Sequence, residues 1–127
     1  NNMENRLEIL HKAKIIDADI YHGMLNVITC LEKKRRLDIR HVQGDMLLTH
    51  MANALMRARR GEAISAIDAD VLSEVTGSAR YPEIAELHHE LLQLFPVSVP
   101  ECEQGYLLAN LYGLLLNQAQ NVPGATV

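Results

Sequence analysis

The sequence predicts an all-α fold, a compact helical bundle of about five to six helices, on three observations. Apolar residues recur at helical spacing along several segments, and no segment alternates in the manner of a half-buried strand. Glycines that can stop a helix, Gly61 and Gly77, follow two of these segments. The connections are short, which favours antiparallel neighbours. Because 127 residues is close to the commonest domain size, we expect residues 1–127 to form a single domain.

The first two helices are expected over residues 3–13 and 18–35. The second would be capped by Asp17 or Asp19, since either carboxylate can accept hydrogen bonds from the free N–H groups of the first turn. Its apolar residues follow i, i+4, i+7, i+11 spacing and are Ile20, Met24, Val27 and Leu31. This spacing predicts one face packed in the core.

A long helix is expected over residues 39–60, ended by Gly61. Its apolar stripe consists of Gly44, Leu47, Leu48, Met51, Ala54, Leu55 and Ala58. At about 100° per residue, Gln43, His50 and Arg57 fall on one strip at the edge of that stripe. A histidine in such a position is packed on one side, can be reached from the other, and is mostly neutral and nucleophilic at pH 7.

Three further segments complete the bundle. Asp68 is expected to cap a short helix that reaches about residue 76, where Gly77 ends it. Pro82 suits the first turn of a helix that reaches about Phe95, and residues 96–100 form a loop. The last helix is expected over residues 101–118, followed by a loosely held tail at 121–127.

The last helix has the same pattern as the long one. Its predicted apolar face consists of Gln104, Leu107, Leu108, Leu111, Leu114 and Leu115, in which Gln104 is the polar member. Glu103 and Asn110 lie on a flanking strip about 80 to 100° away. The flanking strips of the two helices could form one polar patch that contains His50, Arg57, Glu103 and Asn110.

Composition excludes several classes of function. The net charge of −4 argues against a nucleic-acid-binding surface, and the cationic runs at 33–36 and 57–60 lie at predicted helix ends, where the helix dipole favours them. One Phe, four Tyr and no Trp are too few for a base-stacking platform. No window approaches about 18 uninterrupted apolar residues, and the N-terminus lacks the order of a signal peptide. We therefore expect a cytoplasmic protein with no direct nucleic-acid contact and no membrane insertion.

The sequence contains no motif that is typical of an enzyme active site or of a metal site. There is no Gly-rich phosphate loop, nucleophile elbow or paired-carboxylate motif, so we expect no enzyme active site and no cofactor. Cys30 and Cys102 lack metal-ligand neighbours and are expected to be buried reduced thiols. His88 lies on an apolar face and is expected to be a hydrogen-bonded core histidine, whereas His89 faces solvent. The remaining histidines, His11, His22 and His41, show no ligand spacing on one helix face, so no metal site is expected.

Three sequence landmarks resemble the PTS regulation domain, or PRD, family. The first is His50-Met51-Ala52-Asn53-Ala54-Leu55-Met56-Arg57 followed by Gly61-Glu62, which matches the family pattern His-hydrophobic-x-x-Ala-hydrophobic-x-Arg and then Gly-Glu. The second is Tyr81-Pro82-Glu83-Ile84-Ala85, and the third is Glu103-Gln104-Gly105-Tyr106-Leu107-Leu108-Ala109. The landmarks are in the family's order and span about residues 40–116. The family's second histidine is replaced here by Asn110.

The resemblance implies a stand-alone single-PRD regulatory module that is phosphorylated on His50. It implies Arg57 and Glu103 as the surroundings of that histidine, the phosphocarrier protein HPr or a sugar-specific enzyme II as the phosphoryl donor, and a homodimer. Family members usually carry a separate RNA- or DNA-binding segment, for which this chain has no room. An effect on transcription or metabolism would then pass through a partner protein, such as a separate DNA- or RNA-binding regulator.

Two alternatives stay open from the sequence. Seven residues of helix rise about 10 Å, more than an arginine comfortably spans along its own helix, so Arg57 could pair with Glu103 or with a partner chain. The second alternative is a non-phosphorylated dimeric interaction or scaffold protein with a decayed site, in which His50 is a half-buried histidine bonded to Asn110 or to a backbone carbonyl.

Overall fold

The computed structural model describes residues 2–62 and 64–121, and in this part of the chain it contains helices and no strand. The elements are α1 (Asn2–Lys12), α2 (Ala18–Thr29), the π-helical turn η1 (Cys30–Lys34), α3 (Val42–Arg60), α4 (Ala69–Thr76), α5 (Tyr81–Leu92) and α6 (Glu101–Asn121). The predicted all-α bundle is therefore confirmed. None of the helices in the described ranges combines the length and the apolar character that a membrane crossing requires.

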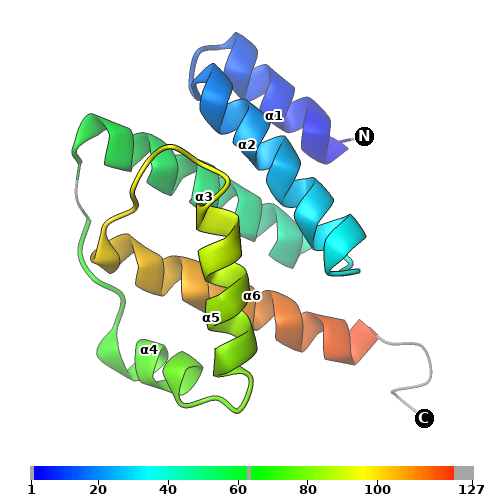
Figure 1. The fold of residues 1–127 in the computed structure, drawn as a ribbon, viewed down its shortest axis with the longest axis vertical. Helices are drawn as coiled ribbons and strands as arrows, with labels where there is room; N and C mark the ends of the chain where they lie inside the picture. The colour runs from blue at the N-terminus through cyan, green and yellow to red at the C-terminus, as the bar shows by residue number, and fades with distance from the viewer. Residues whose placement is uncertain (1, 63, 122–127) are drawn as a thin grey trace.

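The centre of the bundle is the pair α3 and α6, which lie side by side and run in opposite directions (Figure 1). The hairpin of α1 and α2 packs on α3 through α2, and both α4 and α5 pack on α6. The fully buried side chains come mostly from these helices and include Ile20, Met24, Leu47, Met51, Leu55, Ile84, Leu87, Leu91 and Leu107. On α3, Val42 and Met46 are exposed apolar side chains that this packing does not bury.

Helix ends follow the predicted signals at several positions. Gly61 adopts φ 72° directly after α3, a left-handed conformation that glycine accepts without a Cβ penalty. Asp68 caps α4 by accepting hydrogen bonds from the N–H groups of Asp70 and Val71, and Gly77 ends that helix. Asp17 precedes α2 but makes no side-chain cap, and the carboxylate of Asp19 accepts the N–H of Ile20 instead.

The predicted starts and ends of the other helices need correction. The long helix begins at residue 42, not 39, because Ile39 is fully buried and His41 caps the helix, its Nδ1 accepting the N–H of Gly44 at 3.3 Å. A Cβ at Gly44 would lie 1.8 Å from the Ile39 carbonyl oxygen, so this turn requires glycine. The α-helix expected to end at residue 35 ends at 29 and widens into η1, and the helix expected to reach Phe95 ends at Leu92. The last helix runs three residues further, and most of the tail lies outside the described residues.

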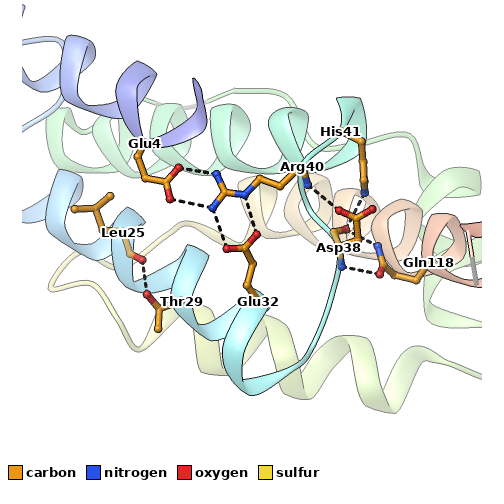
Figure 2. A network of polar contacts seen from close by, with 8 residues as sticks. All are labelled: Glu4, Leu25, Thr29, Glu32, Asp38, Arg40, His41 and Gln118. Carbon is orange, nitrogen blue, oxygen red and sulfur yellow. Dashed lines mark hydrogen bonds and ion pairs between the residues drawn. The ribbon is translucent and has the colours of Figure 1, made fainter. Parts of the chain in front are cut away.

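Polar contacts fasten the segment between η1 and α3 to three elements (Figure 2). The guanidinium of Arg40 donates to Glu4 of α1 and to Glu32 of η1 at 2.6 to 2.9 Å. These hydrogen bonds lower the pKa of Glu4 to about 2. The side-chain amide of Gln118 accepts the N–H of Asp38 and donates to its carbonyl, at 2.8 and 2.6 Å. The entry to α3 is thereby held against the C-terminal half of α6.

Candidate functional site

An ion pair joins α3 to the first turn of α6. Nε and Nη2 of Arg57 donate to the two carboxylate oxygens of Glu103 at 2.7 and 3.0 Å. The Glu103 side chain is 2% exposed and that of Arg57 is 25% exposed. Of the two pairings left open by the sequence, the structure has the one with Glu103. The hydrogen bonds that Arg57 donates to this carboxylate raise the pKa of Arg57 above its ordinary value, so the guanidinium stays charged.

A pocket of about 260 Å³ lies beside this ion pair and contains three of the four predicted site residues. His50 lies at the rim and is exposed, as expected for a histidine at the edge of the apolar stripe. The lining comes from α3, from the connection between α3 and α4, and from α6, and consists of His50, Asn53, Ala54, Arg57, Ile64, Glu103, Tyr106 and Leu107. Within residues 2–62 and 64–121, no hydrogen bond or ion pair involves the His50 imidazole.

The geometry of the ion pair leaves one end of Arg57 available. Glu103 is bound side-on, through Nε and Nη2, so the two N–H groups of Nη1 have no partner in the described part of the chain. Both oxygens of Glu103 are occupied. The pocket therefore has donor groups from Arg57 and a reachable imidazole, and its carboxylate is already neutralised. Such an arrangement favours an anion at the rim, because guanidinium N–H groups bind phosphate-like oxygens strongly.

Asn110 is the one predicted site residue that does not line the pocket. Its amide donates to the carbonyl of Tyr106 at 2.9 Å, one turn earlier on α6, and the residue does not line the pocket. An asparagine that bonds to its own helix backbone does not present that N–H group to a neighbour. The described residues show no hydrogen bond between His50 and Asn110, so three of the four predicted site residues line the pocket and Asn110 bonds to its own helix.

Three pocket residues were missed by the sequence reasoning, namely Asn53, Ile64 and Tyr106. Helical spacing could have identified Asn53 as a site residue, because it lies one turn from His50 on the same side of α3. Tyr106 follows Glu103 by three residues on α6, which places the two on one face. Ile64 belongs to a connection whose path no periodicity describes, so only the tertiary structure could place it.

His88 is a core histidine, as predicted, but only half of its hydrogen-bonding capacity is used. Gln104 donates to the carbonyl of Val99 at 2.8 Å, and the Nε2–H of His88 donates to Gln104 Oε1 at 3.3 Å. His88 and Gln104, each the polar residue of an otherwise apolar helix face, are thus hydrogen-bonded to each other. Nδ1 of His88 is buried and has no partner in the described residues. Burial away from water lowers the pKa of His88 and keeps the ring neutral.

The two cationic runs are largely neutralised by carboxylates of the same chain. Arg35 donates to Glu90 at 2.6 and 3.0 Å, and Lys34 contacts the same carboxylate, which lowers the pKa of Glu90 to about 2. Arg59 binds Asp17 and Asp19, and Arg60 binds Glu62. These pairs agree with the interpretation that the runs complete helix ends.

The cysteines are free, as expected, and both are half-buried rather than buried. Burial and the nearby carboxylate of Glu90 raise the pKa of the Cys30 thiol, which favours the unreactive protonated form.

Two larger pockets, of about 610 and 390 Å³, lie beside α4 and beside the loop that follows α5. Neither contains a Lys, an Arg or a predicted site residue.

Comparison with known proteins gives two similar sequences. The chain is 47% identical over 120 residues to the uncharacterized protein YhfY of Escherichia coli K12, a match that covers 94% of this chain and 100% of the relative. An uncharacterized protein of Haemophilus influenzae is 38% identical over 86 residues, covering 68% of this chain and 69% of the relative. No protein-family model and no solved structure matches the chain. At this identity and coverage, the chain belongs to the same family as YhfY of Escherichia coli.

Proposed function

We propose that this protein is a regulatory module of the sugar phosphotransferase system, similar to a PRD, that is phosphorylated on His50 and acts on transcription or metabolism through a partner protein. The observation that carries the proposal is the exposed imidazole of His50, free of hydrogen bonds within the described residues, at the rim of a pocket shared with Arg57. A nucleophile needs a free lone pair and access for the donor, and this histidine has both.

The chemical step is transfer of a phosphoryl group between two imidazoles. The lone pair of the unprotonated ring nitrogen of His50 forms a new N–P bond while the N–P bond of a phosphohistidine on the donor breaks, and its electron pair returns to the donor ring. Each ring keeps the N–H on its other nitrogen, so protons and electrons balance without another reactant. The chain's own contribution is positioning, and a turnover activity is not part of the proposal.

The transferred group adds roughly −1.5 to −2 charges at the rim of the pocket. Nη1 of Arg57 can bind a phosphoryl oxygen while Nε and Nη2 stay on Glu103, so the buried carboxylate keeps its partner. Asn53 adds an amide donor from the same side of α3. The new charge changes the surface that a partner contacts, with little need to repack the core.

The donor we propose is the phosphocarrier protein HPr or a sugar-specific enzyme II, and the proposed location is the cytoplasm. A homodimer and a separate DNA- or RNA-binding regulator complete the proposed set of partners. Direct nucleic-acid binding is not proposed, because the paired cations at residues 34–35 and 57–60 leave little uncompensated positive charge there.

A second candidate function is a non-phosphorylated dimeric interaction or scaffold protein, and the placement of Asn110 favours it. The residue that replaces the family's second histidine is bonded to its own helix and lies outside the pocket lining. An asparagine cannot accept a phosphoryl group, which counts against a two-histidine switch, and a scaffold would require none.

Incubation with phosphoenolpyruvate, enzyme I and HPr, followed by measurement of acid-labile phosphate, separates the two functions. We expect phosphate on His50, located by mass spectrometry, and none in His50→Ala, which keeps the helix because alanine has the higher helix propensity. His89→Ala is the matched control, since that histidine is also exposed. Phosphate on another histidine, or no phosphate on either the natural protein or His50→Ala, would contradict the proposal. If only Asn110→His accepts phosphate, the chain is a decayed sensor and the scaffold function is correct.

A further inference from the structure

One flank of α3 carries exposed apolar side chains in line with His50. At about 100° per residue, Val42, Met46, His50 and Asn53 lie within about 80° of one another, and we name these four residues the exposed strip. Val42 is 72% exposed and Met46 is 45% exposed. His50 and Asn53 are exposed as well. Apolar residues on consecutive turns beside a reactive group are typical of a contact surface, whereas single exposed apolar residues need no explanation.

The charges that border the exposed strip are paired within the chain. Asp45 binds Arg6 of α1, and Arg57 binds Glu103. The carboxylate of Glu103 is 2% exposed and accepts from Arg57 through both oxygens, whereas Nη1 of Arg57 keeps its N–H groups in the pocket that His50 also lines. The strip is thus a neutral, partly apolar surface that borders a pocket with free guanidinium N–H donors. Its charge complements an apolar surface with one anionic group, and it disfavours a strongly charged partner.

We infer that the exposed strip is the docking surface for the protein that donates the phosphoryl group, a partner that carries a phosphohistidine within an apolar face. This inference rests on the proposed function of His50. Transfer requires the reacting atoms to come within about 3 to 3.5 Å of each other, so the donor must cover the surface around His50.

The size of the strip fits such a contact. Met46 lies one turn from His50 and Val42 two turns, about 6 and 12 Å along the helix. A standard interface buries about 800 Å² on each partner, a patch with a radius of about 16 Å. Both apolar residues therefore fall inside the area that a donor docked on His50 covers.

The test compares two phosphoryl donors on the same variants. HPr, phosphorylated from phosphoenolpyruvate, must dock, whereas phosphoramidate is a small donor that needs no docking surface. We expect Met46→Glu and Met46→Lys each to slow uptake from HPr about tenfold or more, because a charge buried at an interface core is costly in either sign. Uptake at His50 from phosphoramidate stays close to that of the natural protein. Val42→Glu, at the more exposed position, repeats the test with less risk to folding.

Val71→Glu is the matched control, because Val71 is 43% exposed on α4, which packs on α6, and its substitution should change neither rate. Equal rates from HPr for Met46→Glu and the natural protein would overturn the docking inference and leave the proposed function intact. Faster uptake by Met46→Lys would overturn it too, since the effect would then be simple attraction of the donor phosphate. If light scattering shows that Met46→Glu separates a dimer into monomers, a second copy of the chain occupies the strip, and the inference is wrong. Failure of HPr to label His50 in the natural protein refutes the proposed function itself.

Discussion

Removal of Arg57 should destabilise the protein far more than neutralisation of its partner Glu103. The Arg57→Met variant keeps most of the aliphatic volume but leaves a carboxylate that is 2% exposed without its two hydrogen-bond donors. Breaking a buried pair by removing one partner costs about 3 to 5 kcal/mol. Because the Arg57 side chain is 25% exposed, solvent screens part of the interaction, and we expect the lower end, about 3 kcal/mol.

The reverse substitution, Glu103→Gln, should cost only about 1 to 1.5 kcal/mol. The glutamine carbonyl still accepts one hydrogen bond from Arg57, and the partly exposed guanidinium regains water. In the double variant the glutamine is neutral, so the loss should be smaller than the sum of the two single losses, which is the signature of a direct interaction.

Urea unfolding followed by circular dichroism at a fixed protein concentration measures these differences. With a denaturant slope of about 1 to 3 kcal/mol per molar, the Arg57→Met midpoint should fall by roughly 1 to 3 M. A loss below about 1 kcal/mol would mean that the pair behaves as a solvent-screened surface bridge. Equal losses for Arg57→Met and Glu103→Gln would refute the argument from asymmetric burial.

Three further predictions concern other parts of the fold. Gly44→Ala should cost more than about 3 kcal/mol in urea unfolding, because its Cβ would overlap the Ile39 carbonyl oxygen; a loss below about 1 kcal/mol would show that the turn can relax. His88 has a lowered pKa in the folded state, so its neutral form contributes stability above the unfolded pKa of about 6.5, and this contribution is lost as the pH falls below that value. Urea midpoints from pH 7.5 to 5 should therefore decline less steeply for His88→Gln, and identical slopes would contradict the assignment. Arg36→Gly should raise the unfolding free energy by about 1 kcal/mol, because Arg36 has φ 58° after η1; an unchanged or lower value would show that the arginine side chain compensates for the strain.

Helical spacing indicated three residues that line the pocket, His50, Arg57 and Glu103, but it did not indicate the hydrogen-bond partner of the fourth, Asn110. Helical spacing placed His50 and Arg57 at the edge of the α3 stripe, and the structure has both at the pocket. The same reasoning put Asn110 in the patch, but that amide had a competing acceptor in the Tyr106 carbonyl of its own helix. A helical wheel gives the direction of a side chain and says nothing about which of several acceptors it binds.

The early start assigned to α3 has a similar cause. Ile39 fits a helical pattern, yet its side chain is buried by the segment that enters α3, and His41 caps the helix. His41 is not among the strongly preferred capping residues, so no propensity indicated this cap.

The sequence by itself determined that the chain is helical, where several of the helices begin or end, and which stripe of each long helix faces the core. These properties depend on residues within a few positions of each other, through hydrogen bonds of the same turn and apolar residues that recur every third or fourth place. Only the tertiary structure decided that Glu103 rather than a partner chain binds Arg57, and that Ile64 closes one side of the pocket beside His50. Those contacts depend on how far each helix turns about its own axis when α3 and α6 pack, which is set by the fit of side chains across the whole core.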